Sequence, residues 1–446
     1  GIHVGIVDDN PAPGGQVYRQ PSSEFKVTDP HFMGIKHKTG QRLLNEFDAI
    51  RNRCTFYNNA YVWGCFDGDS LSLVRDNKIS LVKYKKLLLS EGAMERPLPF
   101  PGWTLPGVMT LGGLQKLVLY ERVLPGQRIL LAGCSPLLLP VAANIIKAGG
   151  EVVAMCDAVA FRRYLKLLPE LLKHKELAYE AFSSYLSVIK GRVPILRPSA
   201  VISASGQSRV EAVRVTRLDP DGSPVPGSEK QFQIDALGVS HGFLPAGRLA
   251  RLTGCNHAYD SIQHYWRPAV DDYMRSSNPD IYIAGDSSGV DGRDAAVIKG
   301  RLAALHMAVQ LGKMSTPEMR QQTIRLHKEH ARLQRYATAL NRIFSLPAGA
   351  LDIMDKDTIV CRCEQVTVGD VLDGIEKGYR NINEIKRTRA GMGLCQGRMC
   401  ESIVARIMLQ NGIPIEEIGY LNLRPPLSPM PISLFEDFAN SNSRPN

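Results

Sequence analysis

The clearest hydrophobic pattern in the chain is a series of short apolar runs that alternate with helical segments. Residues 2–7 form an apolar run of the β type, which ends in Asp8-Asp9 and a turn rich in Pro and Gly. Residues 128–133, 136–147 and 151–155 have the pattern of a strand, a helix and a second strand. Such a βαβ unit predicts a parallel sheet, and with it an α/β protein.

Helical periodicity becomes dominant after a further apolar strand at residues 281–284. A helix is predicted over residues 295–311. A long amphipathic helix follows, with Thr316 as its N-cap and Pro317 at its first position, and it ends before Pro347. One stripe of this second helix is apolar: Met319, Leu326, Leu333, Leu340 and Phe344. The long helix is suited to linking two domains.

The pattern after residue 350 predicts a compact, helix-rich module. It contains a short strand at 358–360, a helix that opens at Thr367 and ends at Gly378, and a further helix over 396–412. The last thirty residues are rich in Pro, Ser and Asn and have no periodicity, so we expect them to wrap another surface or to stay loose.

Length and composition describe an ordinary folded protein of two or three domains. The 446 residues are 44% hydrophobic and 22% charged, and no apolar run approaches the roughly 20 residues that cross a bilayer. The net charge is +10, but the basic residues are scattered, which favours an acidic partner or an anionic cofactor over nucleic acid. We expect a soluble, cytoplasmic protein, with peripheral association at the inner membrane as the alternative.

Nine cysteines divide into two groups. Five are single residues without a pattern: Cys54, Cys65, Cys134, Cys156 and Cys255. The other four lie within forty residues of one another: Cys361, Cys363, Cys395 and Cys400. This grouping in so long a chain does not resemble the disulfide framework of a small secreted protein, so it indicates a reducing compartment.

The four clustered cysteines have the spacing of a metal site. Four thiolates suit tetrahedral zinc as well as an iron-sulfur cluster, so the ligand set alone leaves both open. The C-x-C pair leans toward iron, because zinc ribbons usually present C-x2-C or C-x4-C pairs. A redox-active disulfide is the third reading of C-x4-C. Lys386, Arg387, Arg389 and Arg398 supply positive charge nearby. A helix N-terminus is expected between Cys395 and Cys400, and both features would stabilise an anionic cluster.

Two segments around these cysteines resemble the bacterioferritin-associated ferredoxin-like 2Fe-2S module. They are Cys361-Arg-Cys-Glu364 and the stretch from Arg389 to Cys400, which reads Arg-Ala-Gly-Met-Gly-Leu-Cys-Gln-Gly-Arg-Met-Cys. The resemblance covers about fifty residues and implies a 2Fe-2S cluster bound by Cys361, Cys363, Cys395 and Cys400.

The N-terminal segment resembles the end of the second strand in flavoproteins with two dinucleotide-binding domains. In that geometry Asp8 would accept hydrogen bonds from the adenosine ribose, and Gly14 and Gly15 would let the chain pass close to FAD. Gln16 and Arg19 follow in the same segment and are further candidates for cofactor contacts. The first strand of that fold and its G-x-G-x-x-G loop are absent from the sequence, so residues upstream are missing or the FAD site is altered.

Two later segments resemble the same flavoproteins. Ser90-Glu-Gly92 stands where the family normally has Ala-Thr-Gly, which places a carboxylate near the expected cofactor. Tyr282-Ile-Ala-Gly-Asp286 resembles the strand whose aspartate holds the ribityl chain or pyrophosphate of the flavin. We therefore expect Gly92, Gly285 and Asp286 to contact FAD.

The second nucleotide-type loop departs from the fingerprint. It reads Gly133-Cys-Ser-Pro-Leu-Leu138, with Ser135 and Leu138 in place of the second and third glycines. A larger third residue should separate helix from strand, so NAD(P)H is not expected as a substrate. His241 and Trp266 lie in segments similar to family loops, and we expect structural roles for both.

The order of these segments over the whole chain resembles one family, the larger subunit of hydrogen cyanide synthase, of opine (octopine or nopaline) oxidases and of dye-linked proline and hydroxyproline dehydrogenases. The resemblance implies a two-dinucleotide-binding-domain flavoprotein with parallel sheets and a small α-rich C-terminal 2Fe-2S domain. The expected divisions follow in chain order: 1–124, FAD-binding domain without its first strand; 125–245, degenerate nucleotide-binding domain; 246–312, return to the FAD-binding domain; 313–350, linker helix; 351–412, 2Fe-2S domain; 413–446, extended tail.

The same resemblance implies that a second flavoprotein subunit oxidises the substrate amines and that this chain transfers the electrons. No residue of this chain is expected to be catalytic. A small ferredoxin-like subunit, FMN at a subunit interface, and a dye or quinone as acceptor are further implications. Two alternatives stay open: a self-contained NAD(P)H-dependent flavin and iron-sulfur reductase, and a non-enzymatic metal-binding scaffold.

Overall fold

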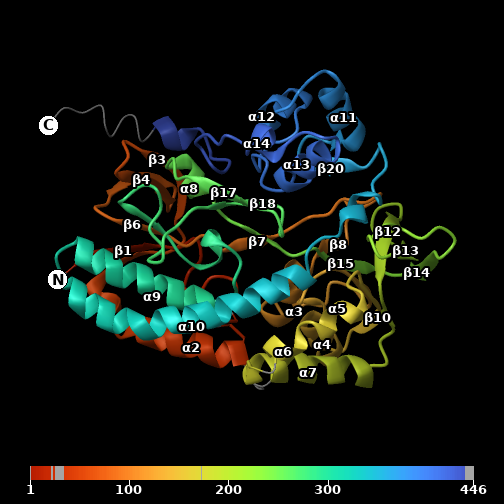
Figure 1. Cartoon of the computed structure of the whole chain (residues 1–446), viewed down its shortest axis with the longest axis horizontal. Helices are drawn as coiled ribbons and strands as arrows, with labels where there is room; N and C mark the ends of the chain where they lie inside the picture. Colours follow the sequence, from red (N-terminus) through yellow and green to blue (C-terminus); the bar gives the residue numbers. More distant parts are fainter. Residues whose placement is uncertain (1, 22–23, 26–34, 172, 437–446) are drawn as a thin grey trace.

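Two groups of strands, one at each end of the long axis, form the framework of the protein (Figure 1). The computed structural model describes residues 2–21, 24–25, 35–171 and 173–436. The α/β fold with parallel sheets expected from the sequence is confirmed. Residues 437–446 of the expected tail lie outside the described residues.

The N-terminal group consists of several small sheets. Parallel pairs are formed by β1 (Val4–Val7) with β2 (Cys54–Tyr57) and by β6 (Leu87–Leu89) with β19 (Ile281–Ile283). An antiparallel meander contains β3 (Tyr61–Phe66), β4 (Ser70–Arg75) and β5 (Lys78–Lys83). The remaining pairs are antiparallel: β7 (Ala93–Glu95) with β16 (Phe243–Pro245), and β17 (His257–Asp260) with β18 (Tyr265–Pro268).

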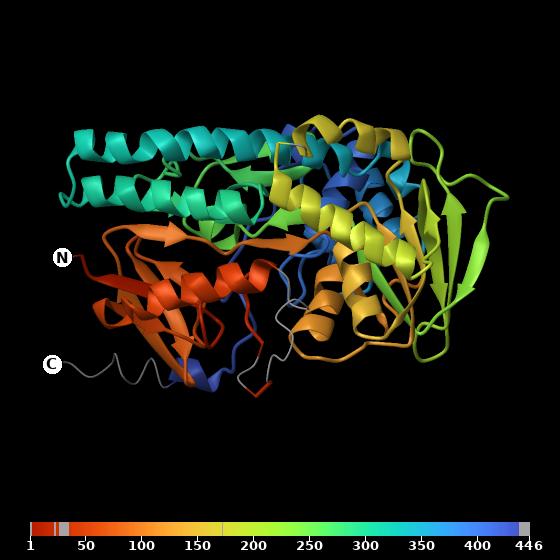
Figure 2. The same cartoon turned by 90° about the horizontal axis from the view of Figure 1, so that it is seen from below.

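Helices pack beside this N-terminal group, and two of them run side by side over most of its length (Figure 2). These two are α9 (Arg293–Gln310) and α10 (Thr316–Ile343). Ser315, rather than Thr316, caps α10, because its side chain accepts a hydrogen bond from the Glu318 amide. Met319 and Leu333 of the predicted stripe are buried, as is Phe344 at the helix end. Shorter elements complete this part: α2 (Ile35–Asp48), η1 (Arg51–Arg53), α8 (Arg248–Leu252) and η2 (Gly285–Ser288).

The second group is a five-stranded parallel sheet in the order β11-β10-β9-β15-β8. Its strands are β8 (Val108–Thr110), β9 (Arg128–Gly133), β10 (Glu151–Asp157), β11 (Ile195–Leu196) and β15 (Ala236–Ser240). Its helices are α3 (Leu111–Leu119), α4 (Leu138–Lys147), α5 (Phe161–Leu165), α6 (Leu168–Leu171) and α7 (Lys175–Lys190). The predicted βαβ unit is β9-α4-β10, with β9 and β10 in parallel register. A separate antiparallel sheet belongs to the same group of strands. It contains β12 (Ser199–Ser205), β13 (Ala212–Arg217) and β14 (Lys230–Gln233).

The C-terminal module is helix-rich, as expected, and packs against both groups (Figure 1). A capping box between Thr367 and Asp370 starts α11 (Val368–Glu376). The other elements of the module follow in chain order: η3 (Ala348–Leu351), β20 (Ile359–Cys361), β21 (Val366–Thr367), α12 (Ile382–Ile385), η4 (Lys386–Thr388), α13 (Glu401–Gln410) and α14 (Ile415–Ile418). Helix α13 begins at Glu401, five residues later than the sequence pattern suggested.

One continuous hydrophobic core joins the module to the five-stranded sheet. Buried residues of the sheet, such as Cys134 and Val239, share it with Phe344 from the end of α10 and with Val360 and Ile403 of the module. The indole N–H of Trp103 also donates to the carbonyl of Ile359 at 2.7 Å. The module is therefore held in a fixed position, although the domain boundaries drawn from the sequence stay a prediction.

The described part of the C-terminal segment crosses back to the N-terminal sheets (Figure 1). The amide of Leu427 donates to the carbonyl of Trp63 at 2.9 Å, and Arg248 donates to the carbonyl of Leu427 at 2.6 Å. The Phe435 ring packs edge-on against Trp63 at 5.3 Å. Up to residue 436 this segment is thus a strap between the module and the β3-β4-β5 meander.

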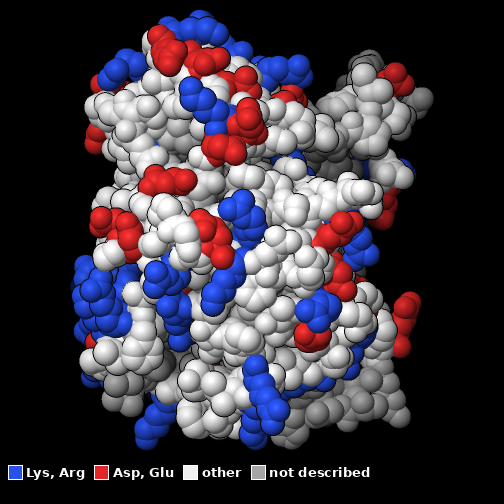
Figure 3. All heavy atoms as spheres, turned by 90° about the vertical axis from the view of Figure 1, so that its right-hand side faces the viewer, with Lys and Arg blue, Asp and Glu red and all other residues white. Residues whose placement is uncertain are grey.

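Lys and Arg side chains are interspersed with Asp and Glu on the face shown in Figure 3, without one continuous basic block. Among the described residues, none of the helices is long and apolar enough to cross a membrane.

Candidate functional site

The end of β1 forms one wall of a large cavity. Asp8 follows the last residue of β1, and its carboxylate accepts hydrogen bonds from the amide and the side chain of Asn10, both at 2.9 Å. Gly14 and Gly15 have positive φ angles of 131° and 58°, so the loop turns tightly in a backbone region that glycine adopts without strain. Gln16 follows them on the cavity wall. This loop leaves the backbone open to close approach by a ligand.

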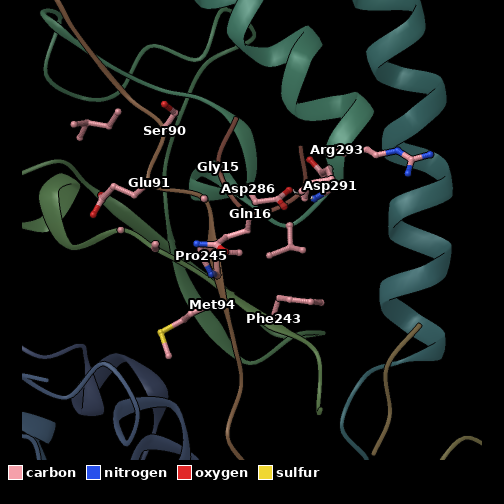
Figure 4. Close-up of a pocket in the computed structure, with 18 of the residues that line it drawn as sticks. Gly15, Gln16, Ser90, Glu91, Met94, Phe243, Pro245, Asp286, Asp291 and Arg293 are labelled. Atoms are coloured by element: carbon pink, nitrogen blue, oxygen red, sulfur yellow. Dashed lines mark hydrogen bonds between the residues drawn. The ribbon is translucent and has the colours of Figure 1, made fainter. Parts of the chain in front are cut away.

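The opposite wall is formed by the turn after β19. The Asp286 carboxylate accepts the amides of Asp291 at 3.1 Å and Gly292 at 3.0 Å, and burial raises its pKa above the ordinary value. Asp286 lines the same cavity as Gly15 and Gln16 (Figure 4). Helix α9 begins directly afterwards and directs its positive end to this region. The site can therefore hold an anionic, hydroxyl-rich group such as the sugar-phosphate part of a nucleotide.

Six of the eight residues predicted to bind the flavin line this one cavity: Asp8, Gly14, Gly15, Gln16, Gly92 and Asp286. The Gly92 amide donates to the Ser287 hydroxyl at 2.8 Å, which ties the two walls together. Gly285 forms the turn before Asp286 with a φ of 69°. Arg19 instead donates to the side-chain oxygen of Asn10 at 2.6 Å and so supports the loop that follows Asp8.

Glu91 is the carboxylate that the sequence places near the cofactor. It lies on the cavity wall, directed away from Gln16 and Asp286 (Figure 4), and accepts the Leu249 amide at 3.2 Å. Burial raises the pKa of Glu91 to about 7, although Arg248 and Arg398 lower it in part. At neutral pH both the neutral and the charged form of this carboxyl group are therefore populated.

The cavity extends from the N-terminal sheets to the C-terminal module. Its volume is about 2110 Å³, and its wall includes Arg398, Glu401 and Ser402 as well as the residues described above. The Arg398 side chain donates to the sulfur of Met94 at 3.3 Å, directly across this junction. The proposed flavin site and the module therefore open into the same space.

The four clustered cysteines meet as two neighbouring pairs. The thiols of Cys361 and Cys400 hydrogen-bond to each other, and so do those of Cys363 and Cys395. The bond with Cys400, together with the backbone amides of Gly391, Glu364 and Cys363, lowers the pKa of the Cys361 thiol to about 6 against the opposing effect of burial. In the described part of the chain, no three His, Cys, Asp or Glu side chains gather around one metal-ion position.

The surrounding loop fits a group larger than a single ion. Two cysteine pairs match a cluster of two iron atoms held by four thiolates. Amides directed at the Cys361 sulfur would stabilise its negative charge. A Cβ atom on Gly393 would lie 2.4 Å from Cβ of Cys363, so only glycine fits here. Cys363 is exposed and Cys361 and Cys400 are buried, which gives the site an outer and an inner side.

The basic residues predicted near the cysteines have other partners. Lys386 donates to the Asn422 carbonyl at 2.8 Å, Arg387 lies over the Tyr379 ring, and Arg389 forms an ion pair with Glu364. The contact between the module and the flavin-binding part that the structure describes is made by other side chains. Those side chains are Met94, Arg251, Arg398 and Glu401.

An aromatic cluster at the same junction was not found from the sequence. Tyr420 of the C-terminal segment packs against Trp266 at 5.4 Å and His257 at 5.1 Å, and Trp266 also contacts Tyr259. Trp266 therefore packs at the junction, and the structural role expected for it stays a prediction. Only a knowledge of which distant segments meet could have revealed this cluster. His241 is buried, and burial lowers its pKa to about 3, so its ring is neutral at physiological pH.

In the second nucleotide-type domain, the acidic side chain that would bind a nucleotide forms hydrogen bonds within the protein. Asp157, at the end of β10, is fully buried and accepts hydrogen bonds from Tyr164 at 2.7 Å and Arg197 at 2.6 Å. A residue at this place normally binds a ribose. A Cβ on Gly133 would lie 1.8 Å from the Ser240 carbonyl oxygen, so the loop packs tightly on β15. The other carboxylate oxygen of Asp157 accepts the Val159 amide at 3.0 Å, so this fully buried side chain is held inside the protein and not presented to a nicotinamide nucleotide.

The fold and the lining of the cavity define a flavin-dependent oxidoreductase with two nucleotide-type domains. Residues 3–312 match the family model of pyridine nucleotide-disulphide oxidoreductases, and residues 355–437 match that of the sarcosine oxidase A3 domain. The L-proline dehydrogenase of P. horikoshii has the same fold, with a TM-score of 0.67 and 19% identity over 97% of this chain and 74% of that one.

Curated relatives narrow this class to one family. The chain is 34% identical to the HcnB subunit of hydrogen cyanide synthase from Pseudomonas aeruginosa, over 98% of this chain and 94% of that protein. It is 30% identical to a subunit of the opine oxidase from Rhizobium meliloti, over 96% of this chain and 82% of that protein. The chain belongs to the family of these proteins, as the sequence motifs had indicated.

Proposed function

We propose that this chain is the electron-transferring subunit of a heteromeric flavin and iron-sulfur dehydrogenase that oxidises the CH–NH group of a glycine-, opine- or proline-type substrate on a partner subunit. The observation that carries the proposal is the shared cavity, because it joins the loop around Gly15 and Asp286 to the module that holds the four cysteines. A flavin-type site and the module that carries the four cysteines border one space, which suits electron transfer between them.

The N-terminal part of the cavity would bind FAD. Asp8 would accept hydrogen bonds from the ribose, while Gly14 and Gly15 leave the backbone accessible. Asp286 already orders the amides of Asp291 and Gly292 at the start of α9, where a pyrophosphate would be stabilised. When bound, the flavin would supply two-electron chemistry and the cluster one-electron chemistry.

The module would bind a 2Fe-2S cluster through Cys361, Cys363, Cys395 and Cys400. The buried pair faces the protein core and the exposed Cys363 faces solvent. The Arg398 side chain extends from the cysteine loop to Met94. It holds the inner side of the cysteine site against the flavin-binding part. These contacts hold the two sites at a constant separation, which electron transfer requires.

The partner would be a second flavoprotein that oxidises the substrate, accompanied by a small ferredoxin-like subunit and by FMN at a subunit interface. The names of the relatives support a multi-subunit enzyme, since each relative is one subunit of a synthase or an oxidase. A dye or a quinone would accept the electrons. The assembly would be cytoplasmic, at most peripheral to the inner membrane.

The test compares the purified chain with the complex that forms when the partner subunit is co-produced. Dye reduction by glycine, octopine, nopaline, proline and hydroxyproline is measured for both. The proposal predicts negligible activity of the chain alone and substrate-dependent activity of the complex. Substrate oxidation by the isolated chain at the rate of the complex would contradict it.

A further inference from the structure

Helix α7 exposes an apolar face that nothing in the described chain covers. Five of its hydrophobic side chains are exposed to solvent: Tyr179 (66% exposed), Phe182 (60%), Tyr185 (41%), Leu186 (39%) and Ile189 (49%). The opposite side of the helix packs on α4, where Val188 is fully buried. The helix runs along the lower edge of the molecule in Figure 1 and across the face turned to the viewer in Figure 2.

The exposed side chains have the spacing of a coiled-coil seam. Tyr179, Phe182, Leu186 and Ile189 follow one another at intervals of three, four and three residues. This is the a-d-a-d order of a heptad, which places all four on one line of contact with a partner helix. A soluble protein rarely leaves such a contiguous face uncovered, so it marks an interaction surface.

The charges beside the seam select the orientation of the partner. Glu176 near the start of α7 and Lys190 at its end both take the e position of the same heptad. In an antiparallel pair, e positions face e positions, so Glu176 of one copy would meet Lys190 of a second copy, and the reverse contact would form by symmetry. Lys175 would approach the negative end of the neighbouring helix dipole. In a parallel pair, Lys190 would have no acidic neighbour.

The apolar side chains obey the same symmetry. With the two-fold axis near the middle of the helix, Tyr179 lies opposite Ile189 of the second copy and Phe182 opposite Leu186. Ser183, at the central e position, would face its own equivalent, where two small polar side chains fit. In this arrangement the apolar side chains of one copy face apolar side chains of the other, and the acidic residue beside the seam faces a basic one.

From this complementarity we propose that two copies of the chain associate through an antiparallel pairing of their α7 helices, forming a symmetric dimer. The occupant of the exposed face is thus a second copy of this chain. The cysteine module lies on other elements, whereas α7 also borders the cavity through Leu177, Glu180, Ala181, Ser183 and Ser184, so the contact would run beside the rim of the cavity. The dimer would be the central unit on which the partner subunits assemble.

The experiment measures the mass of the full-length chain by sedimentation over a concentration series. The wild type is expected to dimerise at micromolar concentrations. Leu186→Asp should raise the dimer dissociation constant at least tenfold. Ile324→Asp is the matched control, because Ile324 is 70% exposed on α10, away from α7, and this variant should dimerise as the wild type does.

Charge reversal distinguishes self-pairing from any other contact. Glu176→Lys and Lys190→Glu should each weaken the dimer, since each brings like charges together at both ends of the seam. An equimolar mixture of the two single variants should recover a heterodimer, and the double variant E176K/K190E should recover the homodimer. A monomeric wild type, a dimer that ignores all of these charges, or a face that binds only the partner subunit would overturn the proposal.

Discussion

Arg251 and Glu401 join the two halves of the proposed electron path. One guanidinium nitrogen of Arg251, on α8, lies 2.8 Å from both carboxylate oxygens of Glu401, in the first turn of α13 directly after Cys400. Both side chains are mostly buried, at 14% and 19% exposure. Glu401 also accepts the Leu421 amide at 3.1 Å, so the pair holds the module, the C-terminal segment and the flavin-binding part together.

Removing this pair should loosen the module. Arg251→Ala leaves the Glu401 carboxylate without its charged partner in a largely buried position, which costs about 2–3 kcal/mol. We expect a lower thermal midpoint and faster proteolytic cleavage of the segment before the module. Arg380→Ala is the control, because its pair with Glu417 is exposed and lies within the module. Equal effects of the two substitutions would contradict the role given to Arg251.

The cysteine site is tested by metal analysis. Purified protein should contain two iron atoms and two acid-labile sulfides per chain, as expected for a 2Fe-2S cluster on four thiolates. Cys395→Ser should abolish the iron-sulfur absorbance but leave the flavin bound, because Cys395 lies in a surface turn outside the N-terminal sheets. Cys54→Ser, at a half-buried cysteine far along the chain, serves as the control. Stoichiometric zinc without sulfide would remove this assignment.

Nicotinamide nucleotides should neither bind to the chain nor reduce its flavin. Asp157 is buried with Arg197 and Tyr164, and Leu138 stands where the fingerprint requires a small residue. NADH and NADPH are therefore expected neither to bleach the flavin nor to bind in a calorimetric titration, whereas dithionite should reduce both cofactors. Rapid anaerobic bleaching by NADH would show that the reductase alternative is correct.

Glu91 should make stability depend on pH. Its pKa of about 7 in the folded protein lies above the ordinary value of 4.5, so the folded state binds the proton more tightly than the unfolded chain. The stability contributed by the protonated group is complete below about pH 4.5 and is lost as pH rises to about 7. The full shift would correspond to about 3 kcal/mol, and water in the cavity should reduce this to about 2 kcal/mol.

Glu91→Gln isolates this contribution, because glutamine keeps an acceptor for the Leu249 amide but cannot ionise. The variant should unfold at a higher denaturant concentration than the wild type at pH 8, and at nearly the same concentration at pH 4.5. Glu151→Gln, at an exposed carboxylate, is the matched control. A constant difference between Glu91→Gln and the wild type at both pH values would contradict the proposed titration.

Local sequence signals predicted the elements whose residues are neighbours along the chain. The βαβ unit from β9 to β10 follows from its apolar pattern, and the start of α11 follows from Thr367 and Asp370. The start of α13 was misplaced, because residues 396–400 form turns around the cysteines instead of the first turn of the helix. Positive φ angles at Gln396 and Gly397 interrupt the helix there.

Contacts between distant segments could not be predicted in this way. Leu427 and Phe435 lie in a stretch without periodicity, and only Trp63 and its neighbours give them a partner. The pairing of Arg251 with Glu401 depends on two helices 150 residues apart in the chain. The glycines and aspartates of the flavin-type site could be named in advance because their segments resemble those of known flavoproteins, but their common cavity depends on the three-dimensional fold.

The central claim is that this chain receives electrons from a partner and passes them through its cysteine module. The most direct measurement uses the assembled complex with Cys363→Ser and follows two signals separately: reduction of the partner's flavin by the amine substrate, and reduction of the external dye. The account predicts that the first signal stays at the wild-type rate and that the second collapses. Unimpaired dye reduction in a complex whose iron-sulfur absorbance is lost would contradict it.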